Sequence, residues 1–424
     1  MRIAEFELTA FRGARSLKLA CHEKLNVFFG INGAGKSTIL DALALSLSWL
    51  VNSMTQQKLG TGRPITEDSI TNGLHTASVK LTIESQGQFF DWTRTKSRKG
   101  HATLMRRGAL QRLKDFSIAF QKEFISQNEA INLPLFVYYP INRAVLDIPL
   151  RIRERHSFDI FAAYEGSLTS GANFRTFFEW FREREDLENE NRRFSSEDPA
   201  SGQFPDPQLQ AVRDALHAFL PEFSNLAVRR NPLRMEVEKN GQRLTVNQLS
   251  DGEKCIIAML GDLARRLAIA NPLRSNPLEG EGVVLIDEID LHLHPRWQRI
   301  LIPNLQTVFP NCQFFITTHS PHVVTHVRPE SLYGLRQGEN GIDVERPSES
   351  YGKNAERILE DLMGLDTTRP NPVEAAIQEI FATIEKGSLK SAKTMLEKLE
   401  KEIGADPELV KASVLIKRKE LIGK

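Results

Sequence analysis

The stretch "LNVFFGINGAGKS", residues 25–37, places an apolar run directly before a glycine-rich turn. Its second part, from Gly30 to Ser37, satisfies the pattern G-x-x-x-x-G-K-[ST], which cradles nucleotide phosphates when it follows a strand and opens a helix. The apolar run predicts the strand, and the residues after Ser37 predict the helix. Because glycines let successive backbone N–H groups converge on phosphate oxygens at a helix N-terminus, we expect a nucleoside triphosphate to bind here.

The side chains of this turn have distinct expected roles. The Lys36 ammonium group would neutralise the β and γ phosphates and assist catalysis, and the Ser37 hydroxyl would ligate Mg²⁺. The alternative interpretation is a glycine turn before an ordinary helix, which would need neither the ammonium group of Lys36 nor the hydroxyl of Ser37. The residues expected to contact the nucleotide are Gly30, Asn32, Gly33, Ala34, Gly35, Lys36, Ser37 and Thr38.

Two later apolar runs end in polar side chains. "VVLIDE", residues 283–288, ends in Asp287, expected to hold Mg²⁺ through water, and Glu288, expected to polarise the water that attacks the γ-phosphate. "QFFITTHS", residues 313–320, brings His319 to a strand end from which it would reach the γ-phosphate. Each pattern alone is also compatible with a structural residue after a buried strand. Their order after the glycine-rich turn favours the catalytic interpretation.

The composition indicates a soluble globular protein. Of the 424 residues, 41% are hydrophobic and 26% are charged, and the net charge is +1, so any nucleic-acid contact must be a local patch. Cys21, Cys255 and Cys312 lack metal-ligand spacing and cannot all pair, which favours a reducing compartment. The first residues do not form a signal peptide, and the apolar helical stretch 39–51 is too short and serine-rich to span a bilayer. We expect a cytoplasmic protein without a membrane partner.

The pattern of strands and helices divides the chain into four segments. Strand and helix patterns fill residues 1–150 and resume over 235–345, whereas residues 151–234 are helical and heavily charged. Alternation on both sides of this insertion predicts an α/β fold, with a mixed sheet whose two sequence halves come together on folding. The insertion is expected to be helical, with its aromatic cluster "FRTFFEWF" in the core. The remaining residues, 346–424, are expected to form a helical C-terminal region.

The segment "LSDGEK", residues 249–254, is by itself ordinary turn and N-cap chemistry. Combined with the three motifs above, however, its order and spacing resemble the ABC-type ATPase head of the P-loop NTPases, as found in SMC proteins, RecF and the OLD nucleases. The opening "EFELTAFRGARSLKL" also resembles the start of these heads, and Arg12 is the matching arginine. The resemblance implies ATP and Mg²⁺ as ligands and Arg12 as a nucleotide contact.

The same resemblance implies a site shared between two copies of the chain. Ser250, Gly252 and Glu253 would belong to the signature motif, which contacts the γ-phosphate bound by the other subunit. Asp290, in the D-loop segment "IDLHLHP", would reach across the same interface. We therefore expect a homodimer or higher oligomer that closes head to head on ATP. The glutamine usual in such heads is absent, and Asn142 or Arg143 lies near its place.

Within this superfamily the chain is most similar to compact bacterial ATPases of the PtuA type, which serve the Septu anti-phage system and occur beside some retrons. That similarity implies an HNH nuclease subunit as partner, together with a retron reverse transcriptase and its DNA or RNA product. The residues after His319 are helical and lysine-rich, so we expect no nuclease activity in the chain itself. Residues 389–403 form an amphipathic helix that either packs on the head or docks the nuclease.

Three alternatives stay open. A DNA-repair ATPase resembling RecF or SMC would bind DNA, a scaffold would bind ATP with little turnover, and a transporter subunit would need a membrane partner. The basic run over residues 94–114 contains no acidic residue and could track a phosphate backbone, or it could be a solvated hairpin tip and helix face. Its members are Arg94, Lys96, Arg98, Lys99, Arg106, Arg107, Arg112 and Lys114.

Overall fold

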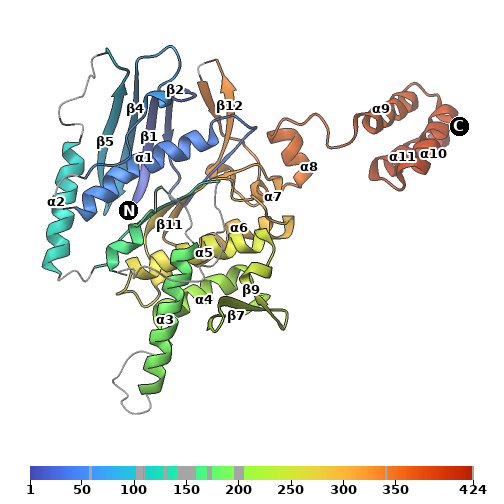
Figure 1. The fold of residues 1–424 in the computed structure, drawn as a ribbon. Helices are drawn as coiled ribbons and strands as arrows, with labels where there is room; N and C mark the ends of the chain where they lie inside the picture. The colour runs from blue at the N-terminus through green and yellow to red at the C-terminus, as the bar shows by residue number, and fades with distance from the viewer. Residues whose placement is uncertain are drawn as a thin grey trace. The chain divides into compact units, whose positions relative to one another are not determined.

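The structure is a computed structural model with two units, residues 1–353 and 354–424. It describes residues 1–56, 60–101, 108, 110–127, 131–141, 159–169, 174–194, 205–339 and 341–422. The first unit contains three sheets and the helices that cover them, and the second contains helices (Figure 1). None of the described helices is both long and apolar enough to cross a membrane.

A six-stranded sheet forms the centre of the first unit, in the order β13-β12-β3-β11-β10-β6. Its strands are β3 (Leu25–Phe29), β6 (Leu135–Tyr139), β10 (Gly282–Ile286), β11 (Cys312–Thr318), β12 (Leu332–Gly338) and β13 (Gly341–Glu345). All neighbours pair in parallel except β12 and β13. Every residue of β3, β6, β10 and β11 is buried, as expected for parallel strands covered on both faces. The predicted α/β fold, assembled from two sequence halves, is confirmed.

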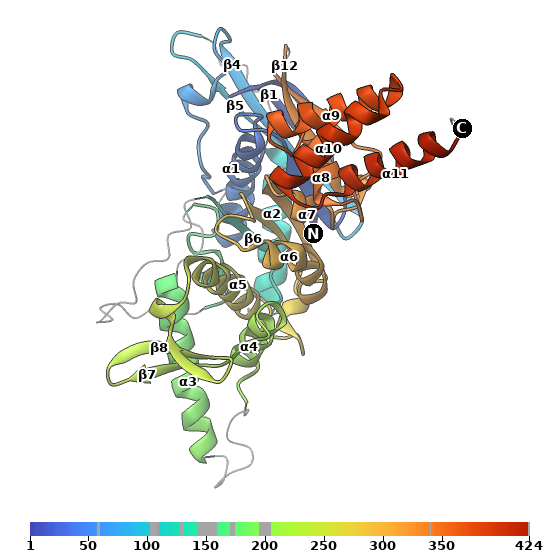
Figure 2. The same cartoon turned by 90° about the vertical axis from the view of Figure 1, so that its right-hand side faces the viewer.

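Helix α1 (Lys36–Thr55) begins at the turn after β3, and α5 (Asp251–Ala270) covers the opposite face of the six-stranded sheet (Figures 1 and 2). Helix α1 is buried on nearly all sides, including Ser46, Ser48 and Ser53, because it also packs under the four-stranded sheet. Further helices are α2 (Gln111–Ser126), α6 (Pro295–Val308) and α7 (Pro321–Val324).

The four-stranded sheet is antiparallel, in the order β2-β1-β4-β5. Its strands are β1 (Arg2–Phe11), β2 (Ala14–Ala20), β4 (Thr76–Ser85) and β5 (Gln88–Ser97). Burial alternates along β4, so one face packs on the interior and the other faces water. Gln86 and Gly87, which join β4 to β5, both have positive φ, as a two-residue hairpin turn requires. β4 and β5 therefore form a β-hairpin.

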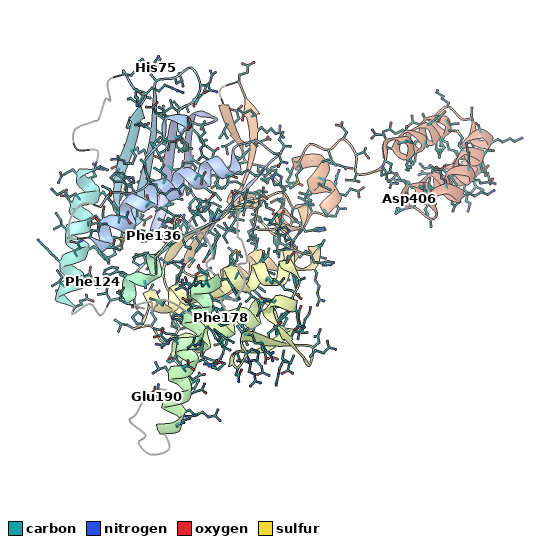
Figure 3. The ribbon with its side chains drawn as sticks, viewed as in Figure 1. His75, Phe124, Phe136, Phe178, Glu190 and Asp406 are labelled. Carbon is teal, nitrogen blue, oxygen red and sulfur yellow. The ribbon has the colours of Figure 1, made fainter. Side chains whose placement is uncertain are left out.

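The segment expected to be a helical insertion contains α3 (Phe174–Phe194) and α4 (Pro207–Phe219), but also the strand β7 (Phe223–Arg230). β7 pairs with β8 (Leu233–Lys239), which pairs with β9 (Gln242–Thr245). The strand is hard to predict because a bulge between Ser224 and Ala227 breaks its two-residue period. The aromatic cluster on α3 lies in the core as expected, and Phe178 is fully buried (Figure 3).

The second unit is a helical bundle with its own apolar core. It contains α8 (Ala355–Arg357), α9 (Asn371–Glu385), α10 (Leu389–Ile403) and α11 (Pro407–Ile422). Ala392, Leu396 and Leu399 of α10 are buried in this core, beside residues of α9 and α11. The apolar face of residues 389–403, expected to pack on the head or dock a partner, therefore packs within the bundle.

Leu396→Ala should destabilise the bundle by about 2–5 kcal/mol, because it opens a cavity among buried aliphatic side chains. Val414→Ala is the matched control, since Val414 lies on α11 with 58% of its surface exposed. Hydrogen exchange on the full chain should show weaker amide protection in α9–α11 for the first variant only. Equal protection in the two variants would contradict the core as described.

Candidate nucleotide-binding site

The turn between β3 and α1 depends on its glycines in two different ways. Gly30 has φ +151°, and a Cβ there would lie 2.4 Å from the Leu335 carbonyl oxygen. Gly35 has φ +99°, and its Cβ would lie 2.2 Å from Ile342 Cδ1. Gly33 has φ +81° but open space around it. Two glycines thus let the loop pass close to β12 and β13, whereas the third serves the backbone conformation alone.

Lys36 is the first residue of α1, and its side chain folds back into the turn. Its Nζ donates to the Gly30 carbonyl at 2.9 Å and to the Ile31 carbonyl at 3.0 Å. Burial lowers the pKa of Lys36, while the carboxylates of Glu288, Asp287 and Asp290 act in the opposite direction. The ammonium group therefore lies close to the acidic end of β10.

The two carboxylates after β10 are held by neighbouring strands. The Asp287 N–H donates to the Tyr139 carbonyl at 2.9 Å, which ties it to β6. The Thr317 hydroxyl donates to Asp287 Oδ1 at 2.5 Å and accepts from the Glu288 N–H at 2.7 Å. Glu288 has φ +45°, an uncommon conformation for a residue with a side chain. Thr317 therefore fixes the Asp287 carboxylate and the Glu288 backbone, a role that was not predicted from the sequence although Thr317 directly precedes Thr318 and His319.

His319 lies beside Glu288, with 3.9 Å between Nε2 and Glu288 Oε1. Burial and the Lys36 charge lower the pKa of His319, whereas the nearby carboxylates act to raise it. The net shift is downward, which favours the neutral imidazole. Thr318, the preceding residue, donates its hydroxyl to Asp290 Oδ1 at 2.5 Å. Within the single chain, Asp290 therefore contacts the strand end that carries His319.

The remaining residues expected at the nucleotide differ in exposure. Asn32 and Gly33 are exposed, Ala34 is buried, and Ser37 and Thr38 are half-buried at the start of α1. Arg12 donates from Nη1 to Asp41 Oδ2 on α1 at 2.6 Å, so it lies against the same helix.

The side chains available for Mg²⁺ are Ser37 and Asp287, which stand at the start of α1 and the end of β10. Among the described residues, no group of three or more His, Cys, Asp and Glu side chains is placed to hold a metal. Two protein ligands suit Mg²⁺, which usually keeps several waters and binds through substrate phosphates.

The signature segment opens α5 with a capping box. Ser250 Oγ accepts from the Glu253 N–H at 3.4 Å, and Glu253 Oε2 accepts from both the N–H and the hydroxyl of Ser250 at 2.8 Å. Glu253 also forms an ion pair with Lys239. A Cβ on Gly252 would lie 2.4 Å from the His292 carbonyl oxygen. Gly252 and Glu253 thus have intramolecular roles, while Ser250 and Asp251 are exposed.

Much of the described basic run contacts the protein itself. The Arg94 guanidinium lies 3.6 Å from the centre of the Trp49 ring, and burial lowers the pKa of Arg94. Arg98 donates to the carbonyls of Leu74 at 3.1 Å and Ile70 at 3.3 Å. Lys96 is half-buried and Lys99 is exposed. Arg106, Arg107 and the glutamine substitute Asn142 lie outside the described residues.

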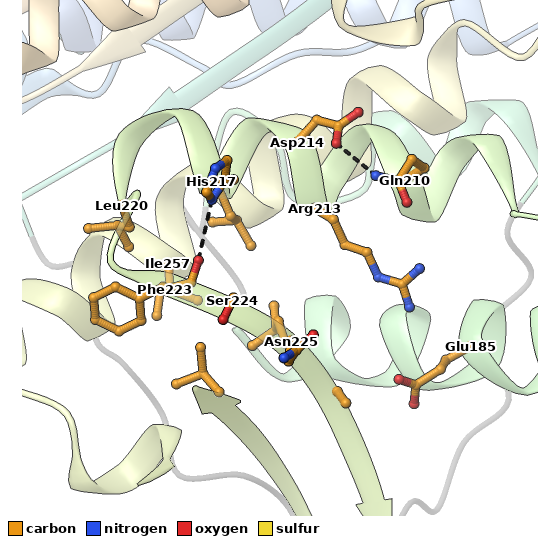
Figure 4. Close-up of a pocket in the computed structure, with 14 residues that line it drawn as sticks. Glu185, Gln210, Arg213, Asp214, His217, Leu220, Phe223, Ser224, Asn225 and Ile257 are labelled. Carbon is orange, nitrogen blue, oxygen red and sulfur yellow. Dashed lines mark hydrogen bonds between the residues drawn. The ribbon is translucent and has the colours of Figure 1, made fainter. Parts of the chain in front are cut away.

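A separate cavity of about 490 Å³ lies among α3, α4 and β7 (Figure 4). Some of its polar groups bond to each other: Gln210 donates to Asp214 at 2.7 Å, and the His217 ring lies 3.5 Å from the Phe223 carbonyl. None of the predicted nucleotide ligands lines it. This cavity is therefore separate from the candidate nucleotide site at the strand ends.

Gly252→Ala should destabilise the isolated chain by roughly 1–3 kcal/mol, because the new Cβ would meet backbone rather than a movable side chain. The overlap should outweigh the gain in helix propensity, about 1 kcal/mol. Thermal unfolding without nucleotide measures the loss, and Asp251→Ala serves as the exposed control. An unchanged unfolding temperature for Gly252→Ala would argue against the close approach to His292.

Lys36→Met should raise the pKa of His319, since it removes a neighbouring positive charge, and Glu288→Gln should lower it, since it removes a negative one. NMR titration of the imidazole resonances measures both shifts, with the His319 signal assigned by its loss in His319→Gln. Shifts of the same sign in the two variants would contradict the arrangement.

The family whose description is "AAA domain, putative AbiEii toxin, Type IV TA system" matches residues 25–325. The chain is 31% identical over 467 residues to the retron Ec83 probable ATPase of Escherichia coli, covering 96% of this chain and 85% of the relative. It is 30% identical over 433 residues to the retron Vc95 probable ATPase of Vibrio cholerae serotype O1 biovar El Tor, covering 91% and 82%.

The chain is also 25% identical over 393 residues to the Septu protein PtuA of Bacillus thuringiensis, covering 90% of this chain and 89% of the relative. A solved SMC head domain from Thermotoga maritima covers 82% of this chain and 100% of its own, at 15% identity and a TM-score of 0.43. We draw no conclusion from that structural likeness. The sequence relatives span most of the chain, and the chain belongs to the ABC-type ATPase family that contains the retron ATPases and Septu PtuA.

Proposed function

We propose that this chain binds ATP at the turn between β3 and α1, hydrolyses it, and uses the nucleotide to close two heads on each other. The observation that carries the proposal is the convergence of Lys36, Asp287, Glu288 and His319 at one edge of the six-stranded sheet. A buried ammonium group beside carboxylates and a neutral imidazole matches what phosphoryl transfer to water requires.

Each residue has a separate part in the proposed reaction. Glu288 is the base that polarises the attacking water, and the neutral His319 ring donates a hydrogen bond from its N–H to the γ-phosphate. Lys36 leaves its carbonyl partners and neutralises phosphate charge. Mg²⁺, held by Ser37 and Asp287, supplies positive charge to the phosphate oxygens when bound. Three carboxylates surround the single ammonium group of Lys36. Their excess negative charge attracts Mg²⁺ and would repel an anionic nucleotide that arrived without it.

Head-to-head closure is proposed because Ser250 and Asp251 stand exposed at the N-terminus of a twenty-residue helix. A helix N-terminus attracts anions, and the γ-phosphate of a second copy is the ligand proposed for it. Asp290, which contacts Thr318 in its own chain, would have to reach across the interface in the closed form.

The names of the relatives support a role in retron or Septu systems. We propose that the nucleotide state of the dimer holds or releases an HNH nuclease partner during phage infection, alongside a reverse transcriptase and its nucleic-acid product. The contacts of Arg94 and Arg98 within their own chain weigh against the alternative of a DNA-repair ATPase that binds DNA at this run.

The test uses Glu288→Gln to separate binding from hydrolysis. The variant should bind ATP yet release phosphate roughly 10²–10⁴-fold more slowly, because the general base is lost. With ATP and Mg²⁺ it should accumulate as a dimer in light scattering. Adding Ser250→Arg should abolish that dimer and preserve ATP binding and folding of the monomer.

Two outcomes would count against parts of the proposal. An unchanged phosphate release rate in Glu288→Gln would remove the hydrolytic role and favour an ATP-binding scaffold. Dimers that persist in the Ser250→Arg background would remove the signature contact instead, and unfolding temperatures recorded for every variant guard against a merely unfolded protein.

A further inference from the structure

Strand β6 ends in two adjacent tyrosines, Tyr138 and Tyr139, whose side chains point to opposite faces of the six-stranded sheet because consecutive strand residues alternate. Helix α1 covers one face and α5 covers the other (Figures 1 and 2). The first helix carries the nucleotide turn of its own chain, and the second carries the signature segment. The Tyr138 side chain therefore faces α1 and the Tyr139 side chain faces α5, the two helices proposed to act on ATP.

Tyr139 makes the connection to α5. Its hydroxyl donates to Asp262 Oδ2 at 3.0 Å, and Asp262 is completely buried. Its carbonyl accepts from the Asp287 N–H at 2.9 Å. One residue thus contacts the signature helix through its side chain and the metal-binding carboxylate through its backbone. Burial raises the pKa of Tyr139, so the phenol stays protonated and can donate.

Asp262 also holds two buried arginines of α5. Arg265 Nη2 and Arg266 Nε donate to its two oxygens, each at 2.7 Å. Arg266 Nη1 donates further to the carbonyls of Ala163 at 2.7 Å and Glu165 at 2.9 Å. Removing three charged groups from water is costly, and an apolar packing would usually be at least as stable. The cluster fixes the position of α5 against β6 and the segment 159–167 by directional bonds.

Tyr138 makes the connection to α1. Burial raises the pKa of Tyr138, and the neighbouring Asp41 carboxylate on α1 acts in the same direction. Asp41 accepts from Arg12 at 2.6 Å. Asp41 and Tyr138 therefore connect α1 to β6, and Tyr139 and Asp262 connect β6 to α5.

We propose that Tyr138 and Tyr139 are positioning residues that couple the nucleotide turn to the signature helix across β6. The proposal rests on the proposed ATP-driven closure and explains how one chain coordinates its two half-sites. A shift of α1 on nucleotide binding would be passed through the buried Tyr138 side chain to β6, and from β6 to α5 through the hydrogen bond between Tyr139 and Asp262.

The test compares Tyr139→Phe with Tyr164→Phe. Each variant removes one phenol hydroxyl, and the Tyr164 hydroxyl donates to the Pro134 carbonyl at 2.6 Å rather than to Asp262 or Asp41. Both should lose similar stability in thermal unfolding. Tyr139→Phe should bind ATP as the parent does, with unchanged KM, but lose about tenfold in kcat and in ATP-driven dimer formation, because a hydrogen bond to a charged group is lost. Tyr164→Phe should keep both.

A double variant tests the path itself. If Tyr138 and Tyr139 act in series, the double variant Tyr138→Phe/Tyr139→Phe should lose no more kcat than either single variant. If they act independently, the fold losses in kcat of the two single variants should multiply. Equal losses of kcat in Tyr139→Phe and Tyr164→Phe would overturn the coupling. A loss of kcat in the double variant that equals the product of the two single losses would overturn it as well. If the parent protein itself neither turns over ATP nor dimerises with it, the proposed function fails, and that result is recognised before any variant is compared.

Discussion

The buried ammonium group of Lys36 is the constraint on which the site depends. Burial disfavours its charge, and two loop carbonyls and the nearby carboxylates offset that cost. The compensation requires that the turn after β3 and the end of β10 meet at one place, with β11 between them. Parallel pairing of β3, β11 and β10 supplies this meeting point, because all three strands end at the same edge. The order of the strands in the sheet is thus what allows the charge of Lys36 to be balanced.

Local patterns in the sequence predicted this edge well. The glycine turn, the apolar strands and the polar residues that end them are all contiguous signals, so the roles expected for Lys36, Asp287, Glu288 and His319 could be stated beforehand. Their placement together agrees with that expectation, although the chemical roles remain proposals. The sheet could be predicted for the same reason, since largely apolar strands with intervening helices have few alternative arrangements.

Contacts between distant segments could not be predicted in this way. Nothing near Gly252 in the sequence shows that its neighbour is the His292 carbonyl, and nothing near Tyr139 points to Asp262. Each contact depends on how two separate elements pack, which a period of two or 3.6 residues does not encode. The amphipathic helix α10 has the same ambiguity, because an apolar face looks alike whether its own bundle or another protein covers it.

Glu288 combines the proposed base with a backbone conformation that side chains rarely adopt, at φ +45°. Glycine would occupy this conformation without the steric cost, which is of the order of 1–3 kcal/mol. Selection for thermal stability alone would therefore favour loss of the carboxylate at this position, and selection for turnover would oppose it. The fold accepts a strained backbone conformation at the residue proposed as the base, so stability and the proposed activity are traded against each other at a single residue.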